Sequence, residues 1–295
     1  MKNKILVSII VNCFNGEEFL AEALESVINQ TYQNWELIFW DNQSSDNSSE
    51  IFKSYKHPNF NYFYAPNHTH LGRARELALK KTKGHWIGFL DCDDIWSPEK
   101  LYRQVSVINS FEGNLGLIYS KCEFFKDRLN INKKIIRESS IKPSKNLPNL
   151  KVSKELCMGN FIPFPSVLYK KDAIIKAGKF SQYKFSPDYF LNLSISLNYD
   201  VFGIDKVLCL YRFHQSNLSI STKEIGILEN IEIIKKLLPK KYSETLSRSH
   251  KTRYLIFLLS NLKIKSAYKF IKKINLINIF LGFIDICLYV KRFNF

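Results

Sequence analysis

The chain has 295 residues, of which 45% are hydrophobic and 24% are charged, with 11 glycines and 9 prolines. This composition supplies enough apolar material for a packed core and excludes collagen-like, coiled-coil, disulfide-scaffold and disordered chains. Because a single core rarely grows beyond roughly 250 to 300 residues, we expect one large domain or one domain with an appendage.

The charge is strongly positive and unevenly distributed. The 43 lysines and arginines outnumber the 27 acidic residues, and the net charge of +16 indicates an anionic partner such as nucleic acid, a phosphorylated substrate or a membrane surface. Residues 1–220 carry 28 basic and 22 acidic side chains, whereas residues 221–295 carry 15 and 5. We therefore place a boundary near residue 220. Since the basic residues form no recognisable nucleic-acid module, no nucleic acid is expected as a partner.

The cysteines and the apolar segments indicate where in the cell the protein is expected. The six cysteines are widely spaced without a C-x-x-C pair, and the N-terminus lacks the pattern of a signal peptide, so we expect a cytoplasmic protein. The longest apolar stretch, Leu276 to Val290, is interrupted by Asn278 and Asp285. It is shorter than the roughly 20 residues that span a bilayer, so no transmembrane helix is expected.

The first 110 residues alternate between apolar runs of strand type and helical patterns. This order predicts an α/β fold with a Rossmann-like, mostly parallel sheet flanked by helices, and a nucleotide-binding half. The expected strands are residues 5–11, 36–40, 60–64 and 85–90, and the expected helices are residues 19–28, about 72–83, and one that begins after Ser97-Pro98-Glu99.

The second part of the chain is less regular. We expect strands at residues 115–125 and 165–170, separated by a solvated Lys-, Asn-, Ser- and Pro-rich loop over about residues 130–151. A helix at 188–197 and a strand at 201–213 follow. From Glu224 onward the pattern is helical, Lys-rich and apolar, which predicts a C-terminal helical appendage.

Asp91, Cys92, Asp93 and Asp94 follow the buried strand ending at Leu90. Side chains two apart share a face of an extended chain, so Asp91 and Asp93 are expected to point together into the crevice at the carboxyl end of the sheet. A divalent cation held together with phosphate oxygens would relieve their repulsion. The alternative, that the cluster caps the next helix, explains Asp94 better than the other two.

A second polar loop, from Asp41 to Asp46, also follows a strand and precedes a helix. By itself such a loop is usually a set of turn formers and helix caps. It becomes informative because its strand is expected to neighbour the first strand, where a nucleotide base would lie.

Over residues 4–220 the chain resembles family-2 glycosyltransferases, which adopt the GT-A fold. The resemblance lies in Ser8–Gly16, Ser26–Tyr32, the Asp41 loop, Gly84–Asp94, Gly159-Asn160-Phe161-Ile162, Gly178-Lys179-Phe180, Pro187-Asp188-Tyr189 and Tyr211-Arg212-Phe213-His214. It implies a nucleotide-binding half over about residues 1–115 and an acceptor half over about residues 116–220. Residues 221–295 show no such resemblance and form a basic, apolar helical tail.

The resemblance also implies roles for individual residues. Asn12, Asp41, Asn42 and Arg75 would line the base and ribose pocket, Asp91 would hold the ribose, Asp93 would coordinate Mg²⁺ or Mn²⁺ at the diphosphate, Asp188 would be the general base, and Arg212 and His214 would contact the diphosphate and the metal. The chain departs from the family at Asn42, where many members have Asp, and at Pro187, where many have Glu. Asn42 can still hydrogen-bond to uracil, but base specificity is less defined.

These observations predict a metal-dependent, inverting hexosyl- or N-acetylhexosaminyltransferase. It would move a sugar from a UDP-sugar to a hydroxyl of a glycan or lipid-linked acceptor in cell-surface polysaccharide synthesis. One alternative is a sugar-phosphate nucleotidyltransferase, but Asn12–Gly16 lacks the basic residues expected of a triphosphate loop. The other is a catalytically degenerate sugar-nucleotide-binding module.

The tail, residues 221–295, has two interpretations. Helices that mix Lys with Leu, Ile and Phe can lie in an anionic membrane interface, which would attach the protein peripherally to the inner face of the plasma membrane. They can equally pack on the catalytic domain and expose a solvated Lys face.

Overall fold

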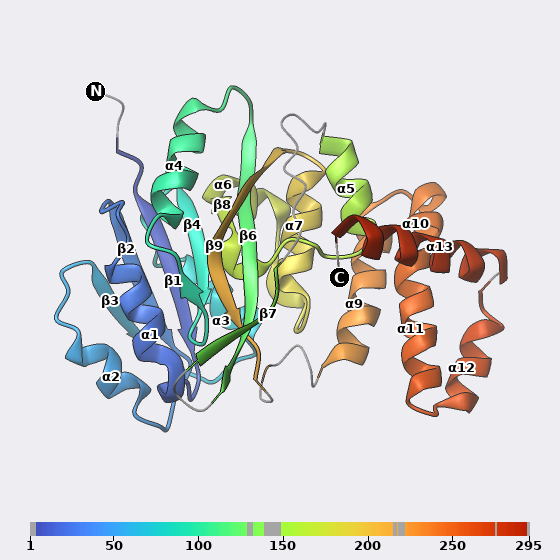
Figure 1. Ribbon diagram of the computed structural model, residues 1–295, viewed down its shortest axis with the longest axis horizontal. Coiled ribbons are helices and arrows are strands. Elements are labelled where there is room, and N and C mark those ends of the chain that lie inside the picture. Colours follow the sequence, from blue (N-terminus) through green and yellow to red (C-terminus); the bar gives the residue numbers. More distant parts are fainter. Residues whose placement is uncertain are drawn as a thin grey trace.

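The computed structural model describes residues 4–128, 132–138, 149–214, 217, 222–274 and 276–293. Its first part is the expected alternation of parallel strands and helices (Figure 1). The strands are β1 (Val7–Cys13), β2 (Trp35–Asp41), β3 (Phe60–Tyr64) and β4 (Trp86–Asp91), and the helices are α1 (Glu17–Ile28), α2 (Ser48–Ser54), α3 (Leu71–Leu79) and α4 (Lys100–Ser110).

The described strands form one sheet in the order β3-β2-β1-β4-β8-β6-β9-β5, with β7 paired to β6. The remaining strands are β5 (Ile95–Trp96), β6 (Leu115–Arg128), β7 (Asn132–Glu138), β8 (Leu168–Lys170) and β9 (Asp200–Arg212). β6 and β9 are parallel, whereas β8 is antiparallel to both of its neighbours. The order reverses at β1, whose Asn12 pairs with Trp40 of β2 and Asp91 of β4. That reversal opens a crevice at the carboxyl ends of these strands.

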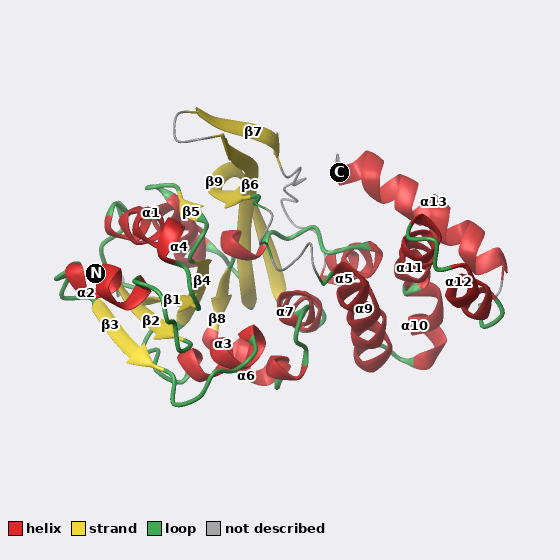
Figure 2. Ribbon diagram, turned by 90° about the horizontal axis from the view of Figure 1, so that it is seen from below, coloured by secondary structure: helices red, strands yellow, loops and turns green. Residues whose placement is uncertain are grey.

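Helices cover both faces of the sheet, and each face has its own apolar cluster (Figure 2). Val7, Ile9 and Val11 of β1 face α1, α2 and α4, whereas Ile10 faces the cluster that contains α3 and α7. Because successive side chains of a strand point to opposite faces, a continuous apolar run is what a sheet covered on both sides requires.

Two expectations for the second part were wrong in detail. Within the stretch expected to be a solvated loop, residues 132–138 form β7 and α5 (Asn149–Met158) has begun, while residues 139–148 lie outside the described part. The expected strand at 165–170 is a 3₁₀ turn, η1 (Phe164–Ser166), followed by the short β8. Beyond these lie α6 (Lys171–Ala177), η2 (Phe180–Gln182) and the expected helix α7 (Pro187–Ser196).

The C-terminal region is helical, as expected, and forms a lobe beside α5 and α7 (Figures 1 and 2). Among the described residues, no helix is both long enough and apolar enough to span a membrane. The lobe consists of α9 (Lys223–Leu237), α10 (Lys240–Leu246), α11 (Arg248–Ser260), α12 (Ile264–Ile271) and α13 (Leu276–Phe293).

Helix α9 is joined to the rest of the molecule by apolar and polar contacts. Ile233 and Ile234 are fully buried in the same cluster as α7. The Glu229 carboxylate accepts hydrogen bonds from the backbone N–H groups of residues 184–186, at 3.0, 2.9 and 2.9 Å. These three residues immediately precede α7, so α9 fixes the chain that leads into that helix.

Candidate active site

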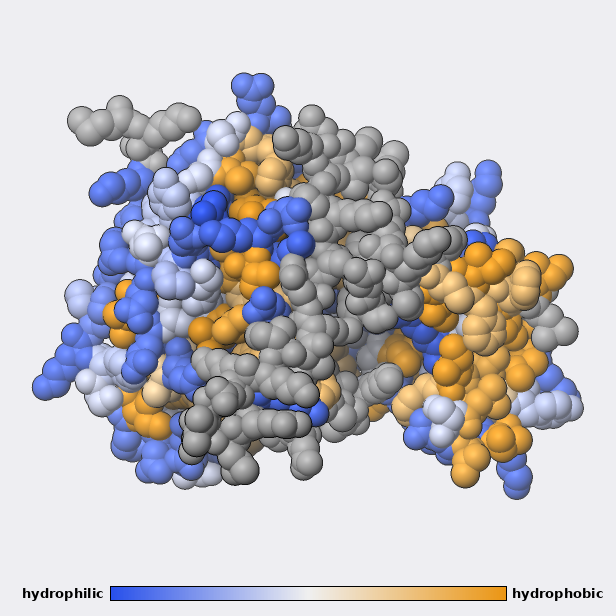
Figure 3. Space-filling model, viewed as in Figure 1, coloured by the Kyte–Doolittle hydropathy of each residue, from blue (hydrophilic) through white to orange (hydrophobic). Residues whose placement is uncertain are grey.

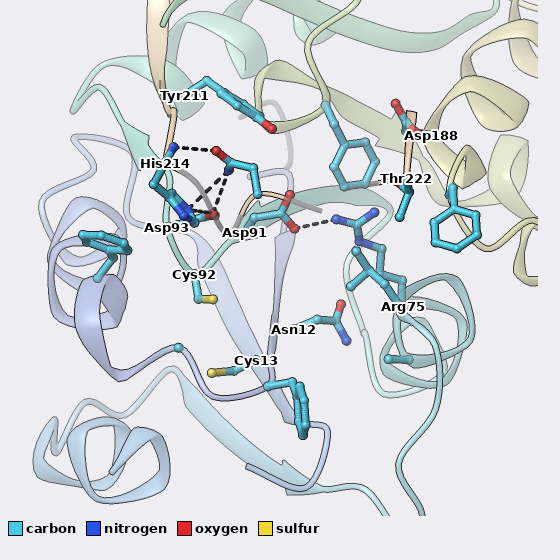
Figure 4. Close-up of a pocket in the computed structure, with 18 of the residues that line it drawn as sticks. Asn12, Cys13, Arg75, Asp91, Cys92, Asp93, Asp188, Tyr211, His214 and Thr222 are labelled. Carbon is cyan, nitrogen blue, oxygen red and sulfur yellow. Dashed lines mark hydrogen bonds and ion pairs between the residues drawn. The ribbon is translucent and has the colours of Figure 1, made fainter. Parts of the chain in front are cut away.

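A cleft of about 1230 Å³ opens at the crevice predicted from the strand order. Its walls come from the ends of β1 and β4, from α3, from the start of α7 and from the segment after β9 (Figure 4). Seven of the residues proposed from the sequence line this cleft: Asn12, Asn42, Arg75, Asp91, Asp93, Asp188 and His214. Asp41 and Arg212 do not line it.

Asp91 ends β4 and forms an ion pair with Arg75 of α3, with 2.5 Å between Oδ1 and Nη2. The Arg75 guanidinium is buried and stacks over the Phe164 ring at 4.1 Å, which holds it in one orientation. Figure 4 shows Arg75 between Asp91 and Asp188. The charge of Arg75 therefore acts on two carboxyl groups, because it pairs with Asp91 and also opposes the rise in the pKa of Asp188.

Asp93 faces the same cleft and pairs with His214, with 2.8 Å between Oδ2 and Nε2. Asn217 Nδ2 lies 3.5 Å from the same carboxylate oxygen and 3.3 Å from the imidazole nitrogen. Burial and the neighbouring Asp91 raise the pKa of Asp93, while His214 opposes the shift. A carboxylate oxygen and an imidazole nitrogen are both ligands of divalent cations. The described residues contain no group of three or more His, Cys, Asp or Glu side chains arranged around one metal position.

Arg212 is buried behind this turn, and its guanidinium packs against the rings of Phe19 and Phe125. Its Nε donates to the carbonyl oxygen of Asp93 at 2.8 Å, and its backbone N–H donates to Asp94 Oδ1 at 2.9 Å. The sequence suggested contact with a diphosphate. In the structure Arg212 instead fixes the backbone of the turn that carries Asp91 and Asp93.

Asp41 is also buried. Its carboxylate accepts hydrogen bonds from the Ser44 N–H and the Tyr62 hydroxyl, both at 2.7 Å. The structure therefore uses Asp41 to shape its own loop instead of bringing it to the cleft. The next residue, Asn42, does line the cleft, and its amide exchanges hydrogen bonds with the Thr69 backbone at 2.6 and 3.2 Å.

Asn12 differs from these residues because its side chain has no partner. It lines the cleft at the end of β1, and neither its Oδ1 nor its Nδ2 has a hydrogen-bond partner although both atoms are buried. Buried polar atoms are nearly always paired, so this amide is a candidate for contact with a ligand.

Asp188 lies in the first turn of α7, after Pro187, and its Oδ2 accepts a hydrogen bond from Asn160 Nδ2 at 2.8 Å. Asn160 Oδ1 accepts in turn from Asn192 Nδ2 at 3.2 Å, and Asn192 Oδ1 accepts from the Tyr169 hydroxyl at 2.7 Å. Burial raises the pKa of Asp188, against the opposing effect of Arg75. This chain of hydrogen bonds holds the Asp188 carboxyl group in position at the cleft.

Two residues of the site were not proposed from the sequence, Asn160 and Asn217. Each lies within or just beyond a segment that carried the family resemblance, which was the available signal. Their contacts to Asp188 and Asp93 bring together positions far apart in the chain, so spacing alone could not reveal them.

Comparison with known proteins identifies the family. The sequence model described as Glycosyl transferase family 2 matches residues 8–164, more than half of the chain. The chain belongs to glycosyltransferase family 2. This glycosyltransferase is 31% identical over 223 residues to UDP-Glc:alpha-D-GlcNAc-diphosphoundecaprenol beta-1,3-glucosyltransferase WfgD of Escherichia coli, a match covering 72% of this chain and 79% of WfgD. It is 27% identical over 237 residues to an uncharacterized glycosyltransferase of Haemophilus influenzae, covering 78% and 76%.

Solved structures of low sequence identity share the fold of this glycosyltransferase. S. aureus TarS 1-349 in complex with UDP-GlcNAc matches with a TM-score of 0.66 at 17% identity, covering 86% of this chain and 73% of that chain. Mannosyltransferase PcManGT from Pyrobaculum calidifontis, in complex with GDP-Man and Mn²⁺, matches with a TM-score of 0.60 at 12% identity, covering 99% and 86%. The expected α/β fold of GT-A type is thereby confirmed.

Proposed function

We propose that this glycosyltransferase moves a hexose or N-acetylhexosamine from a UDP-sugar to a hydroxyl group, with inversion at the anomeric carbon. The observation that carries the proposal is the convergence of Asp91, Asp93 and Asp188 on one cleft, with Arg75 between two of them. Each carboxylate has a different partner, and each can therefore have a different role.

The donor nucleoside is assigned to the side of the cleft formed by Asn12 and Asn42. The unpartnered Asn12 amide offers a donor and an acceptor to a base or ribose, and Asp91 can accept from a ribose hydroxyl. UDP is favoured because the printed name of WfgD specifies UDP-Glc, and because TarS is described in complex with UDP-GlcNAc. PcManGT is described with GDP-Man, so the experiment below compares UDP with GDP.

Asp93 and His214 fit a divalent cation, Mg²⁺ or Mn²⁺. Their facing Oδ2 and Nε2 atoms supply two protein ligands, and Mg²⁺ in proteins is commonly held by one or two carboxylates together with substrate phosphates. When bound, such a cation would neutralise negative charge that develops on the leaving diphosphate. Asp93 thus binds at the diphosphate end of the donor, and Arg212 holds the backbone of Asp93 in place.

Asp188 is assigned as the general base. The acceptor oxygen forms a bond to the anomeric carbon, the bond from that carbon to the diphosphate oxygen breaks, and the acceptor proton passes to the Asp188 carboxylate. Direct displacement by one nucleophile from the far side gives inversion. The raised pKa of Asp188 makes this carboxylate a better proton acceptor near neutral pH, and Asn160 sets its direction.

The acceptor is proposed to be a glycan or a lipid-linked sugar of cell-surface polysaccharide synthesis. Support comes from WfgD, whose printed acceptor is a GlcNAc-diphosphoundecaprenol. An acceptor of that kind would place the reaction at the cytoplasmic side of the plasma membrane. The cleft, at about 1230 Å³, is large enough for the donor and the acceptor sugar together, because pockets for a single small ligand usually measure about 300 to 1,000 Å³.

Calorimetry tests the donor and cation assignments together. The full-length protein is titrated with UDP and with GDP, once in MnCl₂ and once in EDTA. We expect UDP to bind in the presence of Mn²⁺ and binding to be lost for the most part in EDTA and in Asp93→Ala. Asp172→Ala, which removes an exposed carboxylate on α6 far from the cleft lining, is the matched control and should bind UDP normally. Equal affinity with Mn²⁺ and EDTA would contradict the assignment of Asp93.

A further inference from the structure

The outermost helix of the C-terminal lobe, α13, is held against α11 in one fixed rotation. A Cβ atom at Gly282 would lie only 2.0 Å from Thr252 Oγ1 and 2.7 Å from the Arg248 carbonyl oxygen, so the two backbones approach as closely as glycine allows. Three residues further, the buried Asp285 accepts hydrogen bonds from the Arg248 guanidinium, one of them at 2.9 Å. Gly282 and Asp285 therefore define the inner side of α13.

The opposite side of α13 is exposed and apolar. Ile277 and Phe280 are each 65% exposed, and Phe283 and Ile284 are also exposed. Positions 277, 280 and 284 recur at the spacing of one helix face, turned away from Gly282 and Asp285. The packing that buries the acidic residue thus presents a row of large apolar side chains to the outside.

This apolar row continues onto the neighbouring helices. Figure 3 shows hydrophobic residues gathered over the lobe, with hydrophilic residues at its edge. The exposed large apolar side chains of α11, α12 and the turn between them are Ile256, Leu259, Leu262, Ile264 and Tyr268. Together with the exposed α13 residues we call them the outer face. Single exposed apolar residues are common on proteins, but a continuous patch rimmed by polar residues marks an interaction site.

Lysines occur on the same helix as Ile264 and Tyr268 of the outer face. Lys265, Lys269, Lys272 and Lys273 are exposed on or directly after α12. Within the part of the chain that the structure describes, Lys265, Lys269 and Lys273 form no ion pair. The sequence between Glu244 and Asp285 contains no acidic residue at all. The partner of this surface must therefore supply both apolar contacts and negative charge.

We propose that the outer face docks onto an anionic lipid bilayer, with Ile277, Phe280 and Ile284 at the boundary between headgroups and acyl chains and the lysines on lipid phosphates. A second copy of this chain is disfavoured as the partner because residues 221–295 carry a net charge of +10, so self-association would bring like charges together. An apolar face rimmed by lysines is the composition of helices that lie in a membrane interface. This inference stands independently of the proposed transfer reaction.

Flotation of the full-length protein with vesicles tests the inference. We expect the protein to float with vesicles of phosphatidylcholine containing phosphatidylglycerol, to float weakly with phosphatidylcholine alone, and to be released in part by high salt. The variant Phe280→Glu/Ile284→Glu should reduce partitioning by at least about tenfold, because it places charge at the acyl boundary. Lys265→Gln/Lys269→Gln/Lys273→Gln should reduce it on the order of 100-fold, since each basic residue near an anionic surface contributes about fivefold.

The matched control is Ile175→Glu, which changes an exposed isoleucine on α6 outside the outer face and should float like the unchanged protein. Thermal melting confirms that each variant is folded. The proposal is overturned if the unchanged protein does not float, or if both outer-face variants float as well as the control. It is also overturned if light scattering finds a dimer that Phe280→Glu/Ile284→Glu converts to monomer while vesicle binding persists.

Discussion

At the scale of single residues, the polar side chains at the ends of β1 and β2 differ in how many hydrogen bonds the protein already makes to them. The Asp41 carboxylate and the Asn42 amide are bonded to neighbouring loops, whereas both polar atoms of Asn12 lack partners. A buried unpaired amide is unfavourable in the free protein and becomes favourable when a ligand supplies the missing hydrogen bonds. Asn12 is therefore the side chain from which a ligand gains most.

Substitution of Asn12 separates ligand binding from stability. We expect Asn12→Ala to weaken UDP binding by about tenfold, which corresponds to one lost hydrogen-bonding group, and to leave the melting temperature of the ligand-free protein nearly unchanged. Asn42→Ala is the contrasting variant, because it breaks bonds to the Thr69 backbone and should lower the melting temperature. Calorimetry measures the UDP affinity of each variant, and thermal melting measures its ligand-free stability. A large loss of ligand-free stability in Asn12→Ala would show that the amide has a structural role.

Asp188→Asn should separate donor binding from turnover. The amide can still accept a hydrogen bond from Asn160 but cannot take the acceptor proton, so we expect unchanged UDP affinity and a kcat lowered by roughly 10²- to 10⁴-fold. In the unchanged enzyme, activity should rise with pH through the raised pKa of Asp188, because only the carboxylate form accepts a proton. Steady-state rates across pH measure both effects. An active Asp188→Asn enzyme would mean that another group takes the proton.

The site could be predicted from the sequence where neighbours in the chain are also neighbours in the site. Asp91 and Asp93 both line the cleft, as predicted, but the reason differs: β4 ends at Asp91 and the chain turns there, with the Asp94 N–H bonded to the Asp91 carbonyl oxygen. The family resemblance implied contacts of both Arg212 and His214 with the donor and metal, yet only His214 lines the cleft, because Arg212 points inward to the carbonyl of Asp93. Which side of a buried strand faces a ligand depends on sheet twist and packing, which spacing does not encode.

At the scale of elements, long periodic segments were predictable and short ones were not. The runs that became β1, β2 and β4 are apolar because both faces of the sheet are covered. β8 has three residues and β5 has two, and they are strands only because longer neighbours offer hydrogen-bonding edges. β7 lies in a polar, Lys-rich segment and exists through its antiparallel pairing with β6. Such tertiary pairing overrides local propensity.

The contact between α11 and α7 makes stability depend on pH. His250 of α11 is fully buried beside the Tyr189 hydroxyl, and burial lowers the pKa of His250 to about 3 from an ordinary 6.5. Below pH 6.5, His250 is therefore protonated in the unfolded chain but stays neutral in the folded protein. The neutral His250 has no effect on the free energy of unfolding well above pH 6.5. As the pH decreases towards 3 it lowers that free energy, by about 2 kcal/mol at pH 5.

Denaturant unfolding at several pH values measures this slope, and His250→Gln provides the comparison. Glutamine does not titrate, so the variant should lose less stability between pH 8 and pH 5 than the unchanged protein, by about the same 2 kcal/mol. Carboxylates common to both proteins contribute equally and cancel in the difference. Identical pH dependence in the two proteins would show that His250 is accessible to protons in the folded state.

At the scale of the whole molecule, composition and packing divide the chain at different places. The charge changes near residue 220, but α9, which follows that point, contributes Ile233 and Ile234 to the core around α7. Its Glu229 also holds residues 184–186, which lead into Asp188. Helix α9 thus supports the part of the cleft that contains Asp188, while α12, α13 and the end of α11 present the outer face. The interpretation of the tail as a packed appendage therefore holds for α9, whereas membrane contact is proposed for the outer face alone.

This division predicts different results for two truncations. A protein ending at residue 220 loses Ile233, Ile234 and Glu229, and the removal of one buried isoleucine side chain alone costs about 2 to 5 kcal/mol. Since whole domains are stable by only about 5 to 15 kcal/mol, we expect this fragment to aggregate or to melt far below the full chain, and to bind UDP poorly. A protein ending at Leu262 keeps α9 to α11, so it should remain folded and bind UDP. It should float much less with anionic vesicles, because it loses the α13 residues and the lysines of α12 and keeps only Ile256, Leu259 and Leu262 of the outer face. Thermal melting, calorimetry and flotation of both fragments beside the full chain provide the comparison. If the fragment ending at residue 220 were stable and bound UDP as tightly as the full chain, α9 would be a dispensable appendage and the packing argument would be wrong.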